Sequence, residues 1–529
     1  MDGVNDPAVQ TDGPFDRPLF DSPEARALSR VGVVDVGSNS VRLVVFDGAA
    51  RSPAYFFNEK VMCGLGAGMS ETGHLNPTGR ERAMAALRRF ALLAEGMGAG
   101  PLSAVATAAV REATDGPDFA EQVLRETGIR LYVIDGPEEA RLSAQGVLLG
   151  WPGAYGLVCD MGGSSMELAE IEGGRVGRCV SSDLGPLKLR DLKGGKKARK
   201  ARIRRTLEDL QDRLGEQKNR LFLVGGSWRA IAKIDMARRD YPLLVLHEYR
   251  MSAKTVRDTV KFIEKTDADT LKELSGVSSS RIALVPYAAE VLSEAVKMFR
   301  PRDIAISSYG IREGLLYGQM PQALRDRDPL IEASRFAEAK DARIPGSGRV
   351  IYRFISPIFK SAAPERLRLV RAACLLHDVS WRSHPDYRAE DCFENATRAN
   401  LGGLKHSERV FLGLALLHRY SNKRKSTRFN ALEGLISDRD LAEAEILGRA
   451  LRFAAMLWLD ADTEPVRLRW FPRRKVLSLD LAHAAAPLFA EVAQSRFQAL
   501  ANSLGARPEV TIDGRPAEWW RPHPGGTDT

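Results

Sequence analysis

The chain has 529 residues, with 44% hydrophobic and 27% charged residues. This length exceeds one ordinary domain, so we expect three or four globular domains with sizeable cores. No apolar run is long enough for a membrane span, and the five scattered cysteines form no CxxC pair. These features favour a cytoplasmic protein with reduced thiols over a membrane protein, a disulfide scaffold or a zinc site.

The first 320 residues predict a duplicated α/β architecture. Residues 1–29 are polar and acidic and are typical of a disordered tail. A lobe at 30–136 is expected to contain two strands, a helix near 78–96, and further strands at 102–110 and 130–135. A second lobe at 137–320 repeats the pattern, with a helix at 138–149 and strands at 155–161, 165–171 and 221–225. Such duplication predicts an α/β fold of two lobes that face each other across a cleft.

Two segments carry the clearest chemistry, VVDVGSNSVRL around Asp35 and VCDMGGSSMEL around Asp160. Each predicts a buried strand that ends in a carboxylate, then a tight turn of small residues and a second strand. Gly37, Gly162 and Gly163 let backbone N–H groups approach an anion in these turns. Polar side chains in the same turns add donors, and these are Ser38, Asn39, Ser40, Ser164 and Ser165. The carboxylates suit Mg²⁺, so the pair of turns predicts a phosphate held between two lobes.

These segments resemble the two phosphate loops of the exopolyphosphatase / guanosine pentaphosphate phosphohydrolase (Ppx/GppA) family, within the actin-like ATPase and sugar kinase superfamily. Four further family-like segments follow in order, at 106–116, 134–143, 221–235 and 307–318. The resemblance covers about residues 30–320 and implies two actin-like (ribonuclease H-like) lobes, with the helix at 311–320 returning to the first. In the second loop Ser164 and Met166 replace the glycine and threonine that are more common in the family. We expect Ser164 to tolerate the loop's backbone conformation less well than glycine does.

The resemblance also implies roles for individual residues. The second glutamate of the family's Gly-x-Glu-Glu-Ala segment is the catalytic base, and here it is Glu139. The alternative is that Glu138 and Glu139 only stabilise a helix dipole. Asp160 and Glu167 are the candidate ligands of Mg²⁺, although Glu167 also fits a structural hydrogen-bonding role.

Arginines supply the expected contacts to phosphate oxygens. Arg42 and Arg111 are the candidate clamps, because a guanidinium binds anions in a bidentate manner. Arg281 resembles a family arginine that faces the cleft. Glu112 is a second candidate for the base, although an ion pair with a neighbouring arginine explains it more simply. The segment 225–227 resembles a loop that holds adenosine in the sugar kinases, and on its own it is a turn into a helix.

Beyond residue 321 the apolar residues recur almost everywhere with the spacing of an α-helix. It resembles the longer family members, which implies a degenerate HD-like helical domain at 330–465, a small domain at 466–515 and a tail at 516–529. Two strands are expected in the small domain, at 466–471 and 475–481. His377 and Asp378 form an HD pair, but no histidine lies between His247 and His377 to serve as the upstream ligand. Helix packing is therefore the favoured interpretation of the pair.

The net charge is +9, and a basic run at 189–205 contributes much of it. Such a run is either a solvated surface or a contact for a polyanion. We therefore expect Mg²⁺-dependent exopolyphosphatase activity on inorganic polyphosphate. The alternatives are guanosine pentaphosphate phosphohydrolase activity, a non-catalytic sensor of an alarmone or polyphosphate, and, with less support, a sugar kinase. The resemblance implies a homodimer, and no motif supports a nucleic-acid partner.

Overall fold

The computed structural model describes residues 30–47, 51–99, 102–215, 220–421, 429–458, 466–517 and 519–520. The chain forms two compact units, Met1–Pro329 and Leu330–Thr529. The expected tail at 1–29 and most of that at 516–529 lie outside the described residues. Within the described part of the chain, no helix combines the length and the apolar character that a bilayer crossing requires.

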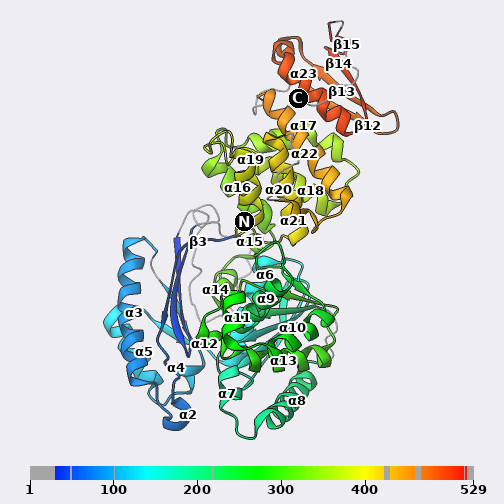
Figure 1. Cartoon of the computed structure of the whole chain (residues 1–529). Coiled ribbons are helices and arrows are strands. Elements are labelled where there is room, and N and C mark those ends of the chain that lie inside the picture. The colour runs from blue at the N-terminus through cyan, green and yellow to red at the C-terminus, as the bar shows by residue number, and fades with distance from the viewer. Residues whose placement is uncertain are drawn as a thin grey trace, which may run out of the picture. The chain divides into compact units, whose positions relative to one another are not determined.

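The first sheet has the strand order β3-β2-β1-β4-β5. Its strands are β1 (Arg30–Val36), β2 (Ser40–Asp47), β3 (Ala54–Met62), β4 (Ser103–Ala106) and β5 (Leu131–Val133). Strand β1 pairs antiparallel with β2 and parallel with β4. Its side chains alternate between two cores, as the twofold period of a strand requires. Val34 and Val36 pack with α3 (Pro77–Gly96) and α5 (Gly116–Thr127) on the outer face (Figure 1).

The strand expected at 102–110 is shorter than the sequence suggested. It ends at Ala106, and Ala108–Glu112 forms the short helix α4. Residues 103–110 are buried and mostly apolar, so periodicity could not separate strand from helix, and the alanines favour a helix once the sheet ends.

The second sheet has the order β10-β11-β9-β6-β7-β8. Its strands are β6 (Gly156–Met161), β7 (Met166–Glu172), β8 (Arg175–Ser182), β9 (Arg220–Val224), β10 (Arg250–Met251) and β11 (Asp303–Ile306). As in the first sheet, the hairpin strand β6 pairs antiparallel with the next strand and parallel with a later one, β9. One face is covered by α8 (Gly195–Leu214), α9 (Gly226–Arg238), α10 (Ala253–Lys265) and α13 (Val285–Phe299).

Two helices, α6 (Gly136–Gly150) and α14 (Ile311–Gly318), share one core with both sheets. Val33 and Val105 enter this core from the first sheet, and Val158 and Phe222 enter it from the second. The helices are in close contact, since a Cβ atom on Gly314 would lie 1.8 Å from the carbonyl oxygen of Leu142. Helix α14 also contacts β1. This packing fixes the N-terminus of α6 between the two sheets.

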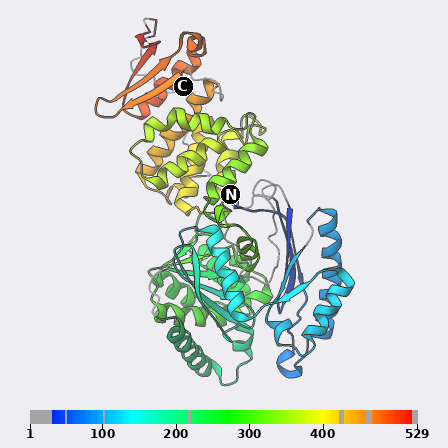
Figure 2. The ribbon, with the colours of Figure 1, turned by 180° about the vertical axis from the view of Figure 1, so that it is seen from behind.

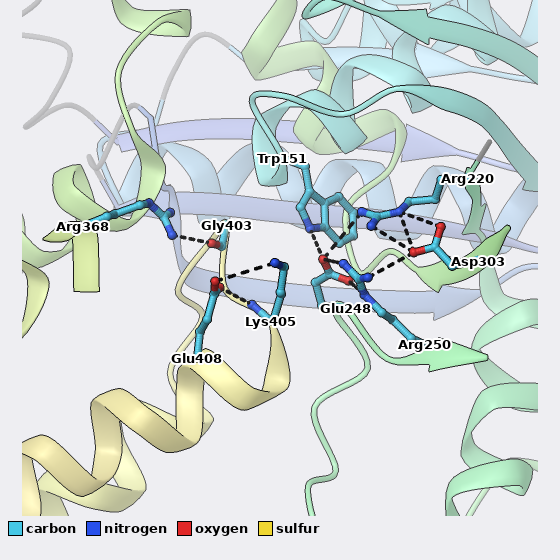
Figure 3. Close-up of polar contacts among 9 residues, drawn as sticks. All are labelled: Trp151, Arg220, Glu248, Arg250, Asp303, Arg368, Gly403, Lys405 and Glu408. Atoms are coloured by element: carbon cyan, nitrogen blue, oxygen red, sulfur yellow. Dashed lines mark hydrogen bonds and ion pairs between the residues drawn. The ribbon is translucent and has the colours of Figure 1, made fainter. Parts of the chain in front are cut away.

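A partly buried polar cluster holds the C-terminal end of α6 against the second sheet (Figure 3). The indole Nε1 of Trp151 donates to Glu248 at 2.8 Å, and Arg250 donates to the same carboxylate at 2.9 Å. Arg220 and Arg250 both donate to Asp303. Because each buried charge has an opposite partner, the cluster can stabilise this edge without an unpaired ion.

The C-terminal unit begins with helices. They are α16 (Pro329–Asp341), α17 (Ser347–Ile355), α18 (Pro364–Leu376), α19 (Arg388–Arg398), α20 (His406–Tyr420), α21 (Asn430–Glu433) and α22 (Asp438–Met456). Within this unit Arg368 donates to the carbonyl oxygen of Gly403, and Glu408 accepts from the backbone N–H of Lys405 at the start of α20 (Figure 3).

A four-stranded sheet follows these helices, in the order β12-β13-β14-β15 (Figure 2). It contains β12 (Val466–Phe471), β13 (Val476–Leu481), β14 (Arg507–Ile512) and β15 (Arg515–Pro516), with α23 (Glu491–Ser503) between β13 and β14. Sequence analysis identified the hairpin β12–β13 but not β14. Strand β14 pairs parallel with β13 across the intervening helix, which local sequence patterns do not reveal.

Candidate active site

The two candidate phosphate loops have the same backbone geometry. The N–H of Gly37 donates to the carbonyl oxygen of Ser40 at 3.0 Å, and that of Gly162 donates to Ser165 at 3.1 Å. Ser164 has no positive φ, so the replacement of glycine there introduces no left-handed backbone strain. The duplicated sequence pattern therefore folds into duplicated turns.

Both turns line one cavity of about 490 Å³ in the N-terminal unit. The sequence-predicted residues on its wall are Gly37, Ser38, Asn39, Ser40, Arg42, Glu139, Asp160, Gly162, Gly163, Ser164, Ser165 and Arg281. Residues 225–227 line the same cavity, as does Asp35. Arg111 and Glu167 are not on the wall. Arg111 reaches the site through Glu139, with which it pairs, and Glu167 lies beside Asp160 on the neighbouring strand.

Glu139 lies in the first turn of α6, where the side chain of Asp135 caps the helix by accepting from the N–H of Glu138 at 2.8 Å. Its side chain is buried, and Oε2 lies 3.6 Å from Nη1 of Arg111. Among the described residues no group donates a hydrogen bond to this oxygen. Burial and the neighbouring carboxylates of Glu167 and Asp160 raise the pKa of Glu139 well above its ordinary value. Glu139 is thus a desolvated carboxylate at the cavity wall whose Oε2 faces Arg111.

Arg111 lies behind Glu139. Its Nη1 donates to the carbonyl oxygen of Ile134 at 2.7 Å, which holds the guanidinium at the end of the preceding strand. Glu112, the alternative base, lies 3.9 Å from Arg111 and 3.7 Å from Lys188, and it is not on the cavity wall. The structure therefore brings Glu139, and not Glu112, to the cavity.

Asp160 and Glu167 lie directly opposite each other on β6 and β7. The hydroxyl of Ser143 donates to Asp160, and that of Ser181 donates to Oε1 of Glu167 at 3.0 Å. Burial raises the pKa of both carboxyl groups. Oε2 of Glu167 is buried and accepts no hydrogen bond from the described residues. An available oxygen beside a second carboxylate fits a hard cation, although the described residues contain no preformed cluster of three metal-binding side chains.

Five cationic side chains line the cavity, and sequence analysis identified only Arg42 and Arg281. The others are Lys60, Arg229 and Arg312. Arg312 lies 3.7 Å from Asp35, and Arg229 donates to the carbonyl oxygen of Gly225 at 3.1 Å. These two arginines occur within the family-like segments at 221–235 and 307–318, which could have identified them. Lys60 lies outside those segments, and nothing local in the sequence distinguished it.

Gly225 begins α9 with φ at 112°, where a side chain is strained. A Cβ atom there would lie 2.5 Å from the carbonyl oxygen of Met161 and 3.0 Å from Oδ1 of Asp160. The glycine thus permits the third loop to approach the second phosphate loop.

In the C-terminal unit, both residues of the HD pair, His377 and Asp378, contact other groups of this chain. Arg343 donates to Asp378 through its backbone N–H at 3.1 Å and through Nε at 3.0 Å. Nδ1 of His377 lies 2.7 Å from the carbonyl oxygen of Cys374. The cavity beside them measures about 30 Å³, so the pair fits an ion-paired packing role.

Comparison with known proteins agrees with this geometry. A model of the Ppx/GppA phosphatase family matches residues 44–323, and one of the exopolyphosphatase C-terminal region matches residues 349–511. Exopolyphosphatase 1 of Mycobacterium bovis is 27% identical over 320 residues, which are 58% of this chain and 92% of that protein. Retrograde regulation protein 2 of Saccharomyces cerevisiae is 25% identical over 441 residues, 75% of this chain and 74% of that one.

Solved structures agree on the fold. The crystal structure of an exopolyphosphatase from Cytophaga hutchinsonii superposes with a TM-score of 0.50 at 21% identity and covers 55% of this chain and 97% of that one. The expected α/β fold of two actin-like lobes is confirmed by this likeness. The family match spans more than half of the chain and includes most of the cavity wall, so the chain belongs to the Ppx/GppA phosphatase family.

Proposed function

We propose that this protein is an exopolyphosphatase that hydrolyses the terminal phosphoanhydride bond of inorganic polyphosphate and releases orthophosphate. The observation that carries the proposal is the position of Glu139, a buried carboxylate on the wall of a cavity that two phosphate loops also line. Hydrolysis requires anion binding, charge neutralisation and a base that orients water, and this wall contains residue types for each task.

Each residue has a proposed role. The backbone and side-chain donors of residues 37–40 and 162–165 bind the terminal phosphate, and Arg42 neutralises its oxygens. Glu139 accepts the proton of the attacking water, and Arg111 holds Glu139 in position through the 3.6 Å ion pair. Burial raises the pKa of Glu139, and a higher pKa makes the carboxylate a stronger proton acceptor.

A divalent cation is part of the proposal, with Mg²⁺ as the expected ion. Asp160 and Glu167 would hold it, because Mg²⁺ typically takes one or two carboxylates together with substrate phosphates. The buried, unbonded Oε2 of Glu167 supports this assignment. When bound, the cation would neutralise charge on the phosphoryl oxygens. A cytoplasmic location and a homodimer remain predictions, and light scattering of the purified chain tests the latter.

The proposal is tested by phosphate release from polyphosphate and from guanosine pentaphosphate, measured side by side with Mg²⁺ and with EDTA. We expect release from polyphosphate in Mg²⁺ only. Glu139→Gln should lower kcat by roughly 10²–10⁴-fold, as is usual for loss of a general base. Glu138→Gln is the matched control, because Glu138 is the preceding residue and pairs with Arg141.

Each alternative predicts a different result. Faster release from guanosine pentaphosphate would assign the chain to that reaction, and binding of either compound without release would indicate a sensor. Normal turnover in Glu139→Gln combined with loss in Glu112→Gln would transfer the role of base to Glu112.

A further inference from the structure

Lys60 is a cation on the cavity wall that the proposed reaction does not yet use. It lies on β3 directly opposite Arg42 of β2, and its side chain lines the cavity. Among the described residues, Asp35 is the one carboxylate among the principal charges that act on its ammonium, and no ion pair joins the two. A solvated surface lysine would also lack a partner, so the charges around Lys60 must decide between the two interpretations.

The surroundings of Lys60 are mostly cationic. The charged groups that act on its ammonium are Arg42 and Asp35 from the first sheet, and Arg281 and Arg229 from α12 (Ser279–Ile282) and α9. Asp35 already has Arg312 as a partner at 3.7 Å. Desolvation of the ammonium at the cavity wall, Arg281 and Arg42 lower the pKa of Lys60 to about 8, although the side chain as a whole is exposed, and a bound anion would remove this cost.

The carboxylates form a separate group within the same site. Glu139 is in the first turn of α6, shortly after β5, whereas Lys60 lies on β3, and these two strands are the opposite edges of the first sheet. The terminal phosphate belongs beside Glu139 and the two loops, because the attacking water must be there. A terminal phosphate held by the two loops and Arg42 still leaves Lys60 and Arg281 without an anion, so the wall has positive charge for a second phosphate.

We propose that Lys60, together with Arg281 of the opposite lobe, binds the phosphate next to the one that is cleaved. This inference rests on the proposed function and adds to it which residues hold the second phosphate of the cleaved anhydride. An anion between Lys60 and Arg281 attracts a cation from each lobe, so the chain of phosphates also draws the lobes together. Orthophosphate alone fills only the subsite at the two loops.

The inference predicts a particular pH dependence. A phosphate beside Lys60 favours its protonated form, so binding above about pH 8 is coupled to uptake of a proton. Affinity for linked phosphates should therefore fall as the pH rises through this value. In Lys60→Arg the charge persists to a much higher pH, so this fall should disappear while affinity is retained.

Calorimetry tests the proposal with orthophosphate, pyrophosphate and tripolyphosphate as probes. The full chain carries Glu139→Gln and the buffer contains EDTA, so that tripolyphosphate stays intact. Lys60→Met should weaken binding of pyrophosphate and tripolyphosphate by roughly 10–100-fold, the usual effect of losing one charge-assisted hydrogen bond. Orthophosphate affinity should change by less than about twofold, because its subsite lacks this bond.

Lys60→Arg is the rescue variant, and Lys261→Met, at an exposed position on α10, is the control for loss of one positive charge. Equal weakening of all three probes would place Lys60 at the terminal phosphate and overturn the inference. Unchanged binding of all three would show a solvated lysine and also overturn it. If the unmodified chain hydrolysed no polyphosphate while Lys60→Met still lost only the linked phosphates, the proposed function would fail and the subsite would stand.

Discussion

Nη1 of Arg111 lies 3.6 Å from Oε2 of Glu139 and 2.7 Å from the carbonyl oxygen of Ile134. The arginine thus connects the end of one strand to the candidate base on the next helix. Sequence analysis assigned Arg111 to the phosphate, whereas the structure places it behind the carboxylate and off the cavity wall. The two roles lead to different kinetics.

Arg111→Met should lower kcat by up to about 100-fold, because a base displaced by about 1 Å loses most of its alignment. The KM for polyphosphate should stay nearly unchanged, since the guanidinium does not line the cavity. Steady-state kinetics separates the two parameters. A large rise in KM with normal kcat would restore Arg111 as a phosphate clamp.

Asp160→Asn should raise the Mg²⁺ concentration needed for half-maximal activity, because a neutral amide is a poorer ligand for a hard cation. We expect an increase of about 10–100-fold, as for loss of groups that support a bound metal. Asp183→Asn, at an exposed surface carboxylate, is the control. An unchanged Mg²⁺ titration would remove Asp160 from the metal site.

Gly225→Ala should destabilise the N-terminal unit and displace the second phosphate loop. The conformation at Gly225 costs a residue with a side chain on the order of 1–3 kcal/mol, and the new Cβ atom would collide with Met161. Thermal unfolding and kcat should both decrease. Gly153→Ala meets no atom within 4 Å and has an ordinary φ, so it should change neither.

The basic helix α8 divides into paired and unpaired cations. Lys196 pairs with Glu264 and Arg199 with Glu290, both at 2.9 Å, while Lys197 and Lys200 are exposed and have no ion-pair partner among the described residues. Replacing Lys197 and Lys200 with glutamine should raise the KM for long polyphosphate and reduce its salt dependence, because fewer counterions are released. Replacing Lys196 and Arg199 should instead cost about 0–1 kcal/mol of stability per pair. Identical salt series for both double variants would make α8 an ordinary solvated surface.

The HD pair should make the C-terminal unit sensitive to acid. Burial and Arg419 lower the pKa of His377 to about 4, whereas an unfolded histidine titrates near about 6.5. As the pH falls from about 6.5 toward 4, His377 takes up a proton in the unfolded chain but not in the folded one. The free energy of unfolding therefore has its full value above this window and decreases within it. His377→Gln should flatten the dependence of the melting temperature on pH in that window. The exposed His384→Gln should keep it.

The sequence by itself determined the duplicated turns. Asp35, Asp160 and the glycines after them are local features, because a buried strand, a carboxylate and a tight turn follow one another within a few residues. The capped start of α6, which presents Glu139, was equally local, since Asp135 and Pro137 directly precede it. For these reasons the lobes, the loops and the helix start at Glu139 were predictable, whereas the role of Glu139 as base was implied by the family resemblance and stays a prediction.

Tertiary structure decided which charges meet. Lys60 reaches the cavity only because β3 pairs with β2, and Arg229 and Arg312 reach it because α9 and α14 begin at its wall. Arg111 and Glu167 are predicted to touch substrate and metal, and in the structure they contact Ile134 and Ser181 from other segments of the chain. Pairings between distant segments have no local signature, because they depend on how strands and helices pack and not on their own propensities.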